Sequence, residues 1–404
     1  MLHRIAWRNI WRNPRRSAML ISAIAVGTFC FLGATAFMDG MAKQMLANTI
    51  NLQGGHIQVA PEGFHTNPTP EMRLAADSAL MAQMDAMVGL RYAPLVRAAG
   101  LASSAERSIG IVLNGIAPEK MAAWNGMDAQ VVEGAWFGPV SEGIIMGKAL
   151  ADYLDLRLGE KMVVLLNDVN NELQSGAFRI EGIVETGNSL YDKANVFLPM
   201  AALQALTGQG SALTLVTINL DDPDALEPIT QELRGMWSGR GAEVLTWRER
   251  IPFLVITMQM YDYSVAVLVI ILFTAVAFTI INSFLMVILE RIHELGIMMA
   301  NGVRPAQVRR MLFLEAFFVA LLGLAAGSVL ATPMLWFWSI NGLDLSQFSE
   351  GLNVIGVQAV IYPYLDPFHI VLGISLIFTI VLLSVSWPAF RASRYQVVEA
   401  INHV

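Results

Sequence analysis

The stretch Ser264–Leu289, SVAVLVIILFTAVAFTIINSFLMVIL, contains no charged residue and is long enough to cross a lipid bilayer as one helix. A spanning helix needs about 20 mainly apolar residues. Three further uncharged stretches meet this requirement: Ser17–Phe37, Ala316–Ile340 and Phe368–Phe390. Only 15% of the 404 residues are charged, against about 25% in ordinary soluble domains. The sequence therefore predicts an integral membrane protein with four transmembrane helices.

The first apolar stretch has a second interpretation, as a cleaved secretory signal. Arg15 and Arg16 precede it, and Ala34-Thr35-Ala36 near its end resembles a cleavage site. The apolar part of a signal peptide is about 7–15 residues long, which is shorter than this stretch. We therefore expect a membrane anchor here.

Basic residues predict the orientation, because short segments rich in lysine and arginine stay in the cytoplasm. Arginines precede the first span, separate the second from the third and follow the fourth, whereas residues 341–367 contain no lysine or arginine. These arginines are Arg4, Arg8, Arg12, Arg15, Arg16, Arg291, Arg304, Arg309, Arg310, Arg391 and Arg394. We expect both termini in the cytoplasm and the region between the first two spans outside.

The residues before the first span predict an amphipathic helix. Its two sides are Arg4, Arg8 and Arg12 against Leu2, Ala6, Trp7 and Ile10. Such a helix would lie on the inner leaflet, with these arginines and the following Arg15 and Arg16 at the membrane surface near anionic headgroups. The alternative is a basic segment without helical structure that only sets the orientation.

The expected fold class is an α-helical membrane protein with four transmembrane helices and a large α+β extracytoplasmic domain between helices 1 and 2. Strand and helix patterns alternate in that domain. They change near residue 130 and again near 212, which favours a split domain (about 45–125 and 212–250) with a β-rich insertion (about 130–208). The expected divisions are 1–16 interfacial helix, 17–38 first span, 39–262 outer domain, 263–289 second span, 290–310 cytoplasmic segment, 311–340 third span, 341–367 outer loop, 368–390 fourth span and 391–404 cytoplasmic tail.

Within the outer domain the pattern predicts individual elements. The first helix should continue through Met41–Asn51 until Gly54-Gly55 breaks it. The expected strands are 56–60, 109–116, 161–166, 177–185, 196–199, 213–220 and 243–246, and the expected helices are 71–87, 148–155, 200–206 and 223–237. Residues 167–176 are polar and predict a hairpin turn.

No motif for catalysis or for a bound cofactor is complete. Gly147-Lys148 is the nearest to a phosphate-binding loop, but glutamate at 142 and alanine at 149 break the pattern. His293-Glu294 opens like a zinc-protease helix, yet position 297 is isoleucine. We therefore expect no metal site and no catalytic group.

A calcium loop and a nucleic-acid surface are also disfavoured. Asp168, Asn170 and Glu172 alternate like calcium ligands, but Leu173 stands where such a loop needs glycine. The net charge of −7 argues against a nucleic-acid partner.

The segment between the second and third spans, Glu290–Pro305 (ERIHELGIMMANGVRP), carries the most informative pattern. We expect the second helix to end at Gly302 and a new helix to begin at Pro305. We refer to residues 290–305 as the elbow. Its polar side would present Glu290, Arg291 and Glu294, and its apolar side Leu295, Met298 and Met299. From spacing alone, a solvated turn between two helices is the simpler interpretation.

Residues 290–316, which end in Phe313-Leu314-Glu315-Ala316, resemble the hallmark of the FtsX/MacB/LolC-LolE superfamily of ABC-transporter permeases. The hallmark is E-R-x-x-E-[IL]-G-[IL]-x-x-A-x-G, followed by a hydrophobic residue and x-x-E-A. Ala6–Arg16 and Pro388–Ile401 are similar to the ends of such permeases, and Gly143–Leu166 and Gly182–Pro199 to their β-rich subdomain. The resemblance covers nearly the whole chain and is closest to the LolC/LolE type, which has no fused ATPase.

The resemblance implies a bacterial inner-membrane permease with a periplasmic domain made of porter and sabre subdomains. The elbow would be the coupling helix that contacts a separate cytoplasmic ABC ATPase, and ATP and Mg²⁺ would bind to that partner, so this chain would have no cofactor and no enzymatic site. Two permeases, identical or paralogous, would pair within the membrane lipid, and a periplasmic carrier or adaptor would be a further partner. The implied coupling residues are Glu290, Arg291, Glu294, Leu295, Gly296, Met299, Gly302 and Arg304.

The spans contain few polar residues, which suits transmission of movement better than passage of a polar solute. Asn282 is predicted to form an interhelical hydrogen bond. Gly323 and Gly327 form a pair of small residues four apart, which is either a close-packing face or a chance feature of a glycine-rich helix. Glu315, one turn inside the third span, is predicted to pair with a basic residue such as Arg291.

Three functions follow from the resemblance. The favoured one is extraction of lipoproteins or other lipid-linked substrates, because chain length and four spans suit a LolC/LolE-type permease. The second is efflux through a MacB-like tripartite pump. The third is an FtsX-like regulator of a cell-wall hydrolase, for which the inserted domain is too large to match well.

Overall fold

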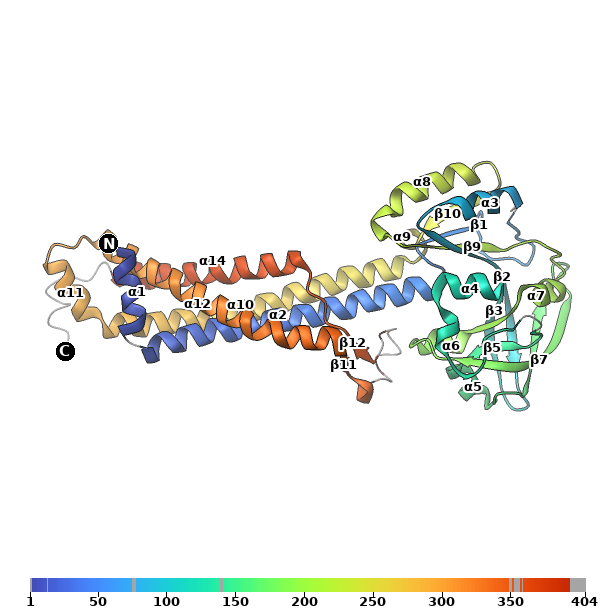
Figure 1. Cartoon of the computed structure of the whole chain (residues 1–404), viewed down its shortest axis with the longest axis horizontal. Helices are drawn as coiled ribbons and strands as arrows, with labels where there is room; N and C mark the ends of the chain where they lie inside the picture. Colours follow the sequence, from blue (N-terminus) through green and yellow to red (C-terminus); the bar gives the residue numbers. More distant parts are fainter. Residues whose placement is uncertain are drawn as a thin grey trace. The chain divides into compact units, whose positions relative to one another are not determined.

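The computed structural model of the chain is shown in Figure 1. It describes residues 2–12, 14–74, 78–138, 141–348, 351, 357 and 359–392. The chain divides into a membrane unit (Met1–Lys43, Met258–Asp344 and Val360–Val404) and a soluble unit (Gln44–Thr257 and Leu345–Ala359). Residues 393–404 of the predicted tail and residues 75–77 of the predicted helix at 71–87 lie outside the described residues.

Four described helices are long and apolar enough to cross a membrane: α2 (Pro14–Leu52), α10 (Pro252–Glu290), α12 (Pro305–Asn341) and α14 (Pro367–Ala392). They confirm the four predicted spans. Both α2 and α10 contain 39 residues, which corresponds to about 58 Å of helix against a hydrocarbon core of about 30 Å. The predicted continuation of the first helix beyond the membrane is confirmed, and α2 ends just before Gly54 and Gly55, whose φ angles are +105° and +74°.

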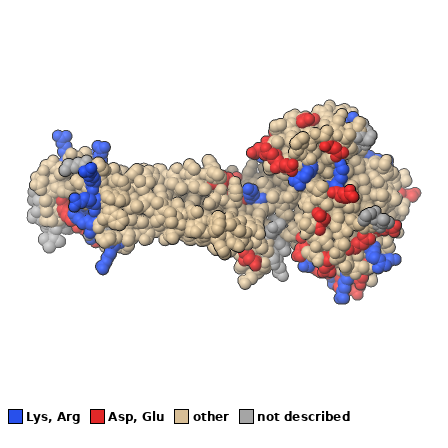
Figure 2. All heavy atoms as spheres, viewed as in Figure 1, with Lys and Arg blue, Asp and Glu red and all other residues tan. Residues whose placement is uncertain are grey.

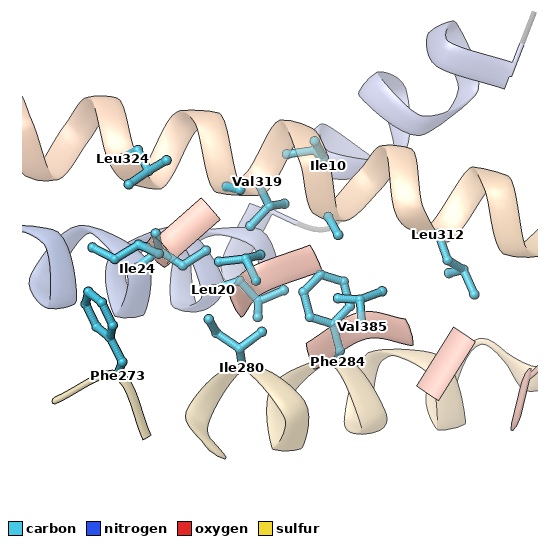
Figure 3. Packing of buried hydrophobic residues seen from close by; sticks show 14 of the residues in the cluster. Ile10, Leu20, Ile24, Phe273, Ile280, Phe284, Leu312, Val319, Leu324 and Val385 are labelled. Atoms are coloured by element: carbon cyan, nitrogen blue, oxygen red, sulfur yellow. The ribbon is translucent and has the colours of Figure 1, made fainter. Parts of the chain in front are cut away.

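Buried side chains from the four long helices form one apolar core (Figure 3). The labelled members include Leu20, Ile24, Phe273, Ile280, Phe284, Val319, Leu324 and Val385. Two shorter helices complete the unit: α1 (Leu2–Arg12), which packs against α12, and α11 (Ile292–Ala300). Figure 2 shows that the visible face of the bundle is nearly free of charge between its two ends and that basic residues gather at the end that carries α1 and α11.

Two small residues let α12 approach α2 closely. A Cβ atom placed on Gly323 would lie 2.6 Å from Ile24 Cβ, and one placed on Gly327 would lie 2.5 Å from the carbonyl oxygen of Ala25. Both distances are too short for any side chain, so both positions require glycine. In a membrane such close contacts replace the hydrophobic effect as the source of helix association.

The part of α2 from Ala36 to Lys43 contacts the segment that leads into α14 and the start of α14. The amide of Tyr364 donates to the carbonyl oxygen of Ala36 at 2.9 Å. Asp39 Oδ2 lies 2.8 Å from His369 Nδ1, and the Lys43 ammonium lies 3.8 Å from the ring centre of Tyr364. Polar contacts therefore bind α2 both to the segment that precedes α14 and to the first turn of α14.

The soluble unit contains alternating helices and strands, most of which confirm the predicted elements. They are β1 (Ile57–Pro61), α3 (Ser78–Ala86), β2 (Leu90–Ser103), β3 (Ser108–Ile116), α4 (Pro118–Asn125), β4 (Val131–Gly134), β5 (Ile144–Gly147), α5 (Lys148–Leu154), β6 (Lys161–Asn167), β7 (Leu173–Val184), α6 (Ser189–Ala194), β8 (Asn195–Pro199), α7 (Met200–Thr207), β9 (Leu215–Leu220), α8 (Leu226–Trp237), β10 (Ala242–Thr246) and α9 (Trp247–Arg250).

The strands of the soluble unit form one ten-stranded sheet in the order β10-β1-β9-β2-β3-β8-β5-β7-β4, with β6 paired to β2 and β7. Two short strands of the membrane unit, β11 (Leu343–Asp344) and β12 (Val360–Ile361), pair with each other. Strand β2 connects the two sections that the sequence separates. Its first half pairs with β9 through Leu90–Leu95, and its second half pairs with β3 and β6 up to Ser103. The hydrogen-bonded sheet is thus continuous through the split domain and the insertion, and their division into subdomains stays a prediction.

The structure differs from the sequence analysis in three places in the soluble unit. The helix predicted at 71–87 begins only at Ser78, and Leu74 instead forms a β-bridge with Leu213. The sequence shows no strand signal for β2, because Pro94, Gly100 and several alanines interrupt the expected β pattern. Gly100 is nevertheless required there, since a Cβ atom would lie 2.7 Å from the carbonyl oxygen of Leu165 on β6. The predicted turn at 167–176 is shorter than expected because β7 already begins at Leu173.

We expect Gly327→Leu to destabilise the membrane unit, because the new side chain would collide with the backbone of α2 at Ala25. Overpacking of this kind typically costs about 1–3 kcal/mol. Ala325→Leu is the matched control, since Ala325 is exposed on the same helix. Thermal unfolding of the purified chain in detergent measures the difference, and equal midpoints for the two variants would contradict the close packing of α2 and α12.

Candidate functional site

The elbow is made of two helices and two breaks. Helix α10 ends at Glu290, and Arg291 leaves the helical conformation with φ −105° and ψ 12° before α11 begins at Ile292. We predicted one continuous helix up to Gly302, and this prediction is wrong at Arg291, where the helix is interrupted. The break falls at the arginine whose side chain reaches carboxylates on both α11 and α12.

The second break has the predicted chemistry. Gly302 has a φ of +90°, which favours glycine, and the amide of Val303 donates to the carbonyl oxygen of Met298 at 3.1 Å. Helix α12 then begins at Pro305 as expected, and the amide of Arg304 donates to the side chain of Gln307 at 2.9 Å. These contacts cap the end of α11 and the start of α12.

A buried ion pair lies under the elbow. Arg291 Nη1 is 3.2 Å from Glu315 Oε2, and only 9% of Arg291 and 6% of Glu315 are exposed. Arg291 Nε also donates to Glu294 Oε2 at 3.2 Å. The predicted pairing of Glu315 with Arg291 is confirmed.

Helix α1 and the start of α2 extend this network. The amide of Asn9 donates to Glu315, the guanidinium of Arg12 donates to both oxygens of Glu294, and Arg16 pairs with Glu290. The hydrogen bond from Arg12 lowers the pKa of the Glu294 carboxyl, so that carboxyl is ionised at neutral pH. Each acidic residue of the network therefore has a cationic partner from another part of the membrane unit.

Sequence reasoning missed this role of three residues. Arg12 and Arg16 were expected only at the membrane surface, and Asn9 had no assigned role. Arg4, Arg8 and Arg15 are exposed, as a surface position requires. The partner of an arginine on another helix depends on tertiary packing, and no local spacing encodes it.

The amphipathic pattern of α1 corresponds to its packing. Ala6 and Ile10 are buried, and Trp7 meets Phe318 of α12 edge to face with ring centres 5.4 Å apart. These contacts fix α1 on α12, which brings Asn9 and Arg12 to the elbow. The side chain of Leu2 lies outside the described residues.

The elbow has a buried side and an exposed side. Leu295 and Gly296 are buried in the bundle, and Met299 is half-buried. The exposed residues of the elbow are Glu290, His293, Glu294, Ile297, Ala300, Asn301, Gly302, Arg304 and Pro305. Ile297, at 44% exposure, is an apolar side chain among these polar neighbours.

The remaining predicted site residue, Asn282, is exposed on α10 and forms no hydrogen bond with any residue that the structure describes. The described residues also contain no group of three His, Cys, Asp or Glu side chains that could hold a metal ion. What the elbow offers chemically is a charged, partly apolar binding surface over a fixed ion-pair network.

Replacing Glu315 by leucine is expected to destabilise the chain by about 3–5 kcal/mol, because Arg291 would stay buried without its charged partner. The double variant Arg291→Met/Glu315→Leu should lose much less than the sum of the two single changes. Arg12→Gln, which breaks an exposed pair, should cost about 1 kcal/mol or less. Unfolding in detergent gives the values for these three variants and for Arg291→Met alone, and additive losses would contradict the coupling.

Two family models match the chain. The FtsX-like permease C-terminal model matches residues 265–397, and the MacB-like periplasmic core domain model matches residues 17–236. The matches include the elbow and most of the soluble unit.

Individual relatives are similar over most of the chain. The lipoprotein-releasing system transmembrane protein LolC of Xylella fastidiosa is 21% identical over 397 residues, which cover 95% of this chain and 92% of that protein. LolC of Neisseria meningitidis serogroup B is 22% identical, with 95% and 93% covered. The macrolide export ATP-binding/permease protein MacB of Escherichia coli K12 is 22% identical over 345 residues, which cover 81% of this chain but only 51% of MacB.

The two family models fall on the two parts of the fold. The core-domain match contains every strand from β1 to β9, and the permease match contains most of α10, the elbow and all of α12. The chain therefore belongs to the FtsX-like permease superfamily with a MacB-like periplasmic core domain, and it is a permease subunit of the ABC-transporter type.

Proposed function

We propose that this chain transmits movement from a separate cytoplasmic ATPase to its periplasmic domain. The ATPase would bind the exposed side of the elbow, and closure of its ATP sites would move the elbow together with the helices bound to it. The observation that carries this proposal is the ion-pair network, which joins the elbow to α1, α2 and α12.

The lengths of α2 and α10 support transmission. Each is one helix without a break over 39 residues, and each includes residues of both units. A helix without a kink transfers a displacement at one end to the other end. No further linker is needed between the membrane and the periplasmic domain at these two points.

The interior of the described bundle supports transmission over solute passage. The buried polar side chains of the spans are Thr28, Thr35, Asp39, Glu315 and Ser384. The hydroxyls of Thr28 and Thr35 each donate to the carbonyl four residues earlier at 2.8 Å, so their helix already satisfies them. A transported polar solute would need unpaired polar groups along its path.

The favoured substrate is a lipoprotein or another lipid-linked molecule of the inner membrane. LolC relatives match nearly the full length of both chains, and a lipid anchor is reached from the bilayer without a polar channel. A second candidate is MacB-like efflux, which the match over 81% of this chain supports. A periplasmic lipoprotein carrier encoded nearby would favour the first, and an adaptor with an outer-membrane duct the second.

The proposed setting is the bacterial inner membrane, with both termini and the elbow in the cytoplasm. The arginines at the elbow end of the bundle support this orientation (Figure 2). The permease would work as a pair, with an identical or paralogous partner and one ATPase under each elbow.

We expect Ile297→Asp to weaken binding of the partner ATPase by at least about tenfold, because a buried carboxylate in the interface would lack a partner. Val88→Asp is the control, since Val88 is an exposed apolar residue of the soluble unit. Co-purification and ATP hydrolysis by the complex are measured together with thermal unfolding of each variant. Unchanged ATPase binding by a folded Ile297→Asp chain would refute the coupling surface.

The substrate class is tested in proteoliposomes that contain the chain, its paired permease and its ATPase. We expect ATP-dependent release of a triacylated lipoprotein to a soluble carrier, and no release of the same protein reconstituted through a peptide transmembrane anchor. Macrolide transport by the same vesicles without lipoprotein release would favour the MacB-like alternative and contradict the favoured one.

A further inference from the structure

The soluble unit contains a cavity of about 480 Å³ whose wall combines several basic and amide side chains. They include Gln58 from β1, Arg97 from β2, Arg250 at the end of α9, and His65. A second cavity of about 420 Å³ shares His65 and Arg97 as lining residues. Volumes of this size are typical of small-molecule sites.

The two arginines of the cavity are not neutralised by any acidic residue that the structure describes. No described aspartate or glutamate forms an ion pair with Arg97 or with Arg250. Burial lowers the pKa of Arg97, and burial together with repulsion from Arg97 lowers the pKa of Arg250 to about 10. Arginine keeps its charge in proteins, so both guanidinium groups are positive and repel each other.

His65 adds no positive charge. Burial, with the charges of Arg250 and Arg97, lowers its pKa to about 4. The ring is neutral at neutral pH and can donate one hydrogen bond. Repulsion from both arginines acts on the ring of His65, so the three side chains lie in one positive field.

Several donors of this cluster have no acceptor. Arg97 uses only Nε, which donates to Asn114 Oδ1 at 3.0 Å, and its two terminal nitrogens donate to no described residue. Arg250 Nη2 donates to the Gly55 carbonyl at 3.1 Å, and Nη1 donates to the Gln53 carbonyl, but its Nε has no partner among described residues. Three of the six guanidinium nitrogens therefore donate to no described residue.

Gln58 and His65 also have buried polar atoms without a hydrogen-bond partner among the described residues. Gln58 is completely buried, and neither atom of its amide has a hydrogen-bond partner among the described residues. His65 Nε2 is likewise buried without one. A Cβ atom placed on Gly54 would lie 2.5 Å from Gln58 Nε2 and 3.0 Å from Arg250 Nη1, so these two groups meet at the same point.

A buried donor without an acceptor is costly, and a buried charge without a counter-charge costs more. One oxyanion would satisfy both requirements, because it brings negative charge and several acceptor lone pairs. Guanidinium groups match carboxylate and phosphate geometry with paired hydrogen bonds. We propose that this cavity is a binding site for a phosphate or carboxylate group, held by Arg97, Arg250, Gln58 and His65.

The oxyanion could belong to a free small molecule or to a lipid headgroup, so the test uses two probes. The full-length chain in neutral detergent is titrated by calorimetry with inorganic phosphate and, separately, with dihexanoyl phosphatidylglycerol. We expect one site per chain in at least one titration. Tighter binding of the lipid identifies a headgroup, and tighter binding of phosphate identifies a free anion.

The variants Arg97→Gln and Arg250→Gln should weaken that binding at least about tenfold, because each removes a charged donor. Matched controls lie on the same elements. Arg91→Gln changes an exposed arginine of β2 that pairs with Asp221 at 3.0 Å, and Arg248→Gln changes one of α9 that stacks on Trp247. Both controls should bind like the unchanged chain.

Two results would overturn the site. One is the absence of binding by the unchanged chain for both probes up to about 10 mM. The other is binding that Arg97→Gln and Arg250→Gln leave intact. Thermal unfolding without ligand shows which variants are folded, and two independent positions keep the test decisive if one of them fails to fold.

Discussion

The ion pair between Arg291 and Glu315 is the constraint on which the arrangement of the elbow depends. Burying two charges costs several kcal/mol for each ion, and only close pairing with further hydrogen bonds offsets that cost. Here Arg291 contacts Glu294 as well as Glu315, and Glu315 also accepts from Asn9. These residues come from α1, α12 and the elbow. If one of these elements moved away, a buried charge would lose its partner or become exposed to solvent.

Helix α2 is likewise held in place by contacts with several neighbouring helices. Gly323 and Gly327 let α12 contact its middle, Arg16 pairs with Glu290 near its start, and Asp39 pairs with His369 farther along. The helix is therefore bound at three heights to three different helices. In the proposed mechanism, these three attachments would couple a displacement of the elbow to α2. None of these residues would have this role alone, because each contact of α2 needs a partner on another helix.

The sequence was sufficient wherever the information is local. Apolar length predicted the spans, Gly302 and Pro305 predicted the end of the bend, and a glutamate one turn inside a helix predicted its pairing with Arg291. It was insufficient where a residue's role depends on a distant segment. Strand β2 contains Pro94 and Gly100, and only its partners β9, β3 and β6 make it a strand. The role of Asn9 likewise depends on Glu315, which lies on another helix.

Arg291 is buried, Arg97 and Arg250 are half-buried, and the two environments differ in one respect. Under the elbow, Arg291 has two carboxylates within 3.2 Å, so its charge is compensated by the chain itself. In the cavity of the soluble unit, Arg97 and Arg250 are half-buried, and the hydrogen-bond partners that the structure describes for them are neutral. The first arrangement is complete and stabilises one geometry. The second leaves charge and donors unmatched in a space large enough for a ligand, and a fold that retains this cost in its core domain gains from it only when an anion binds.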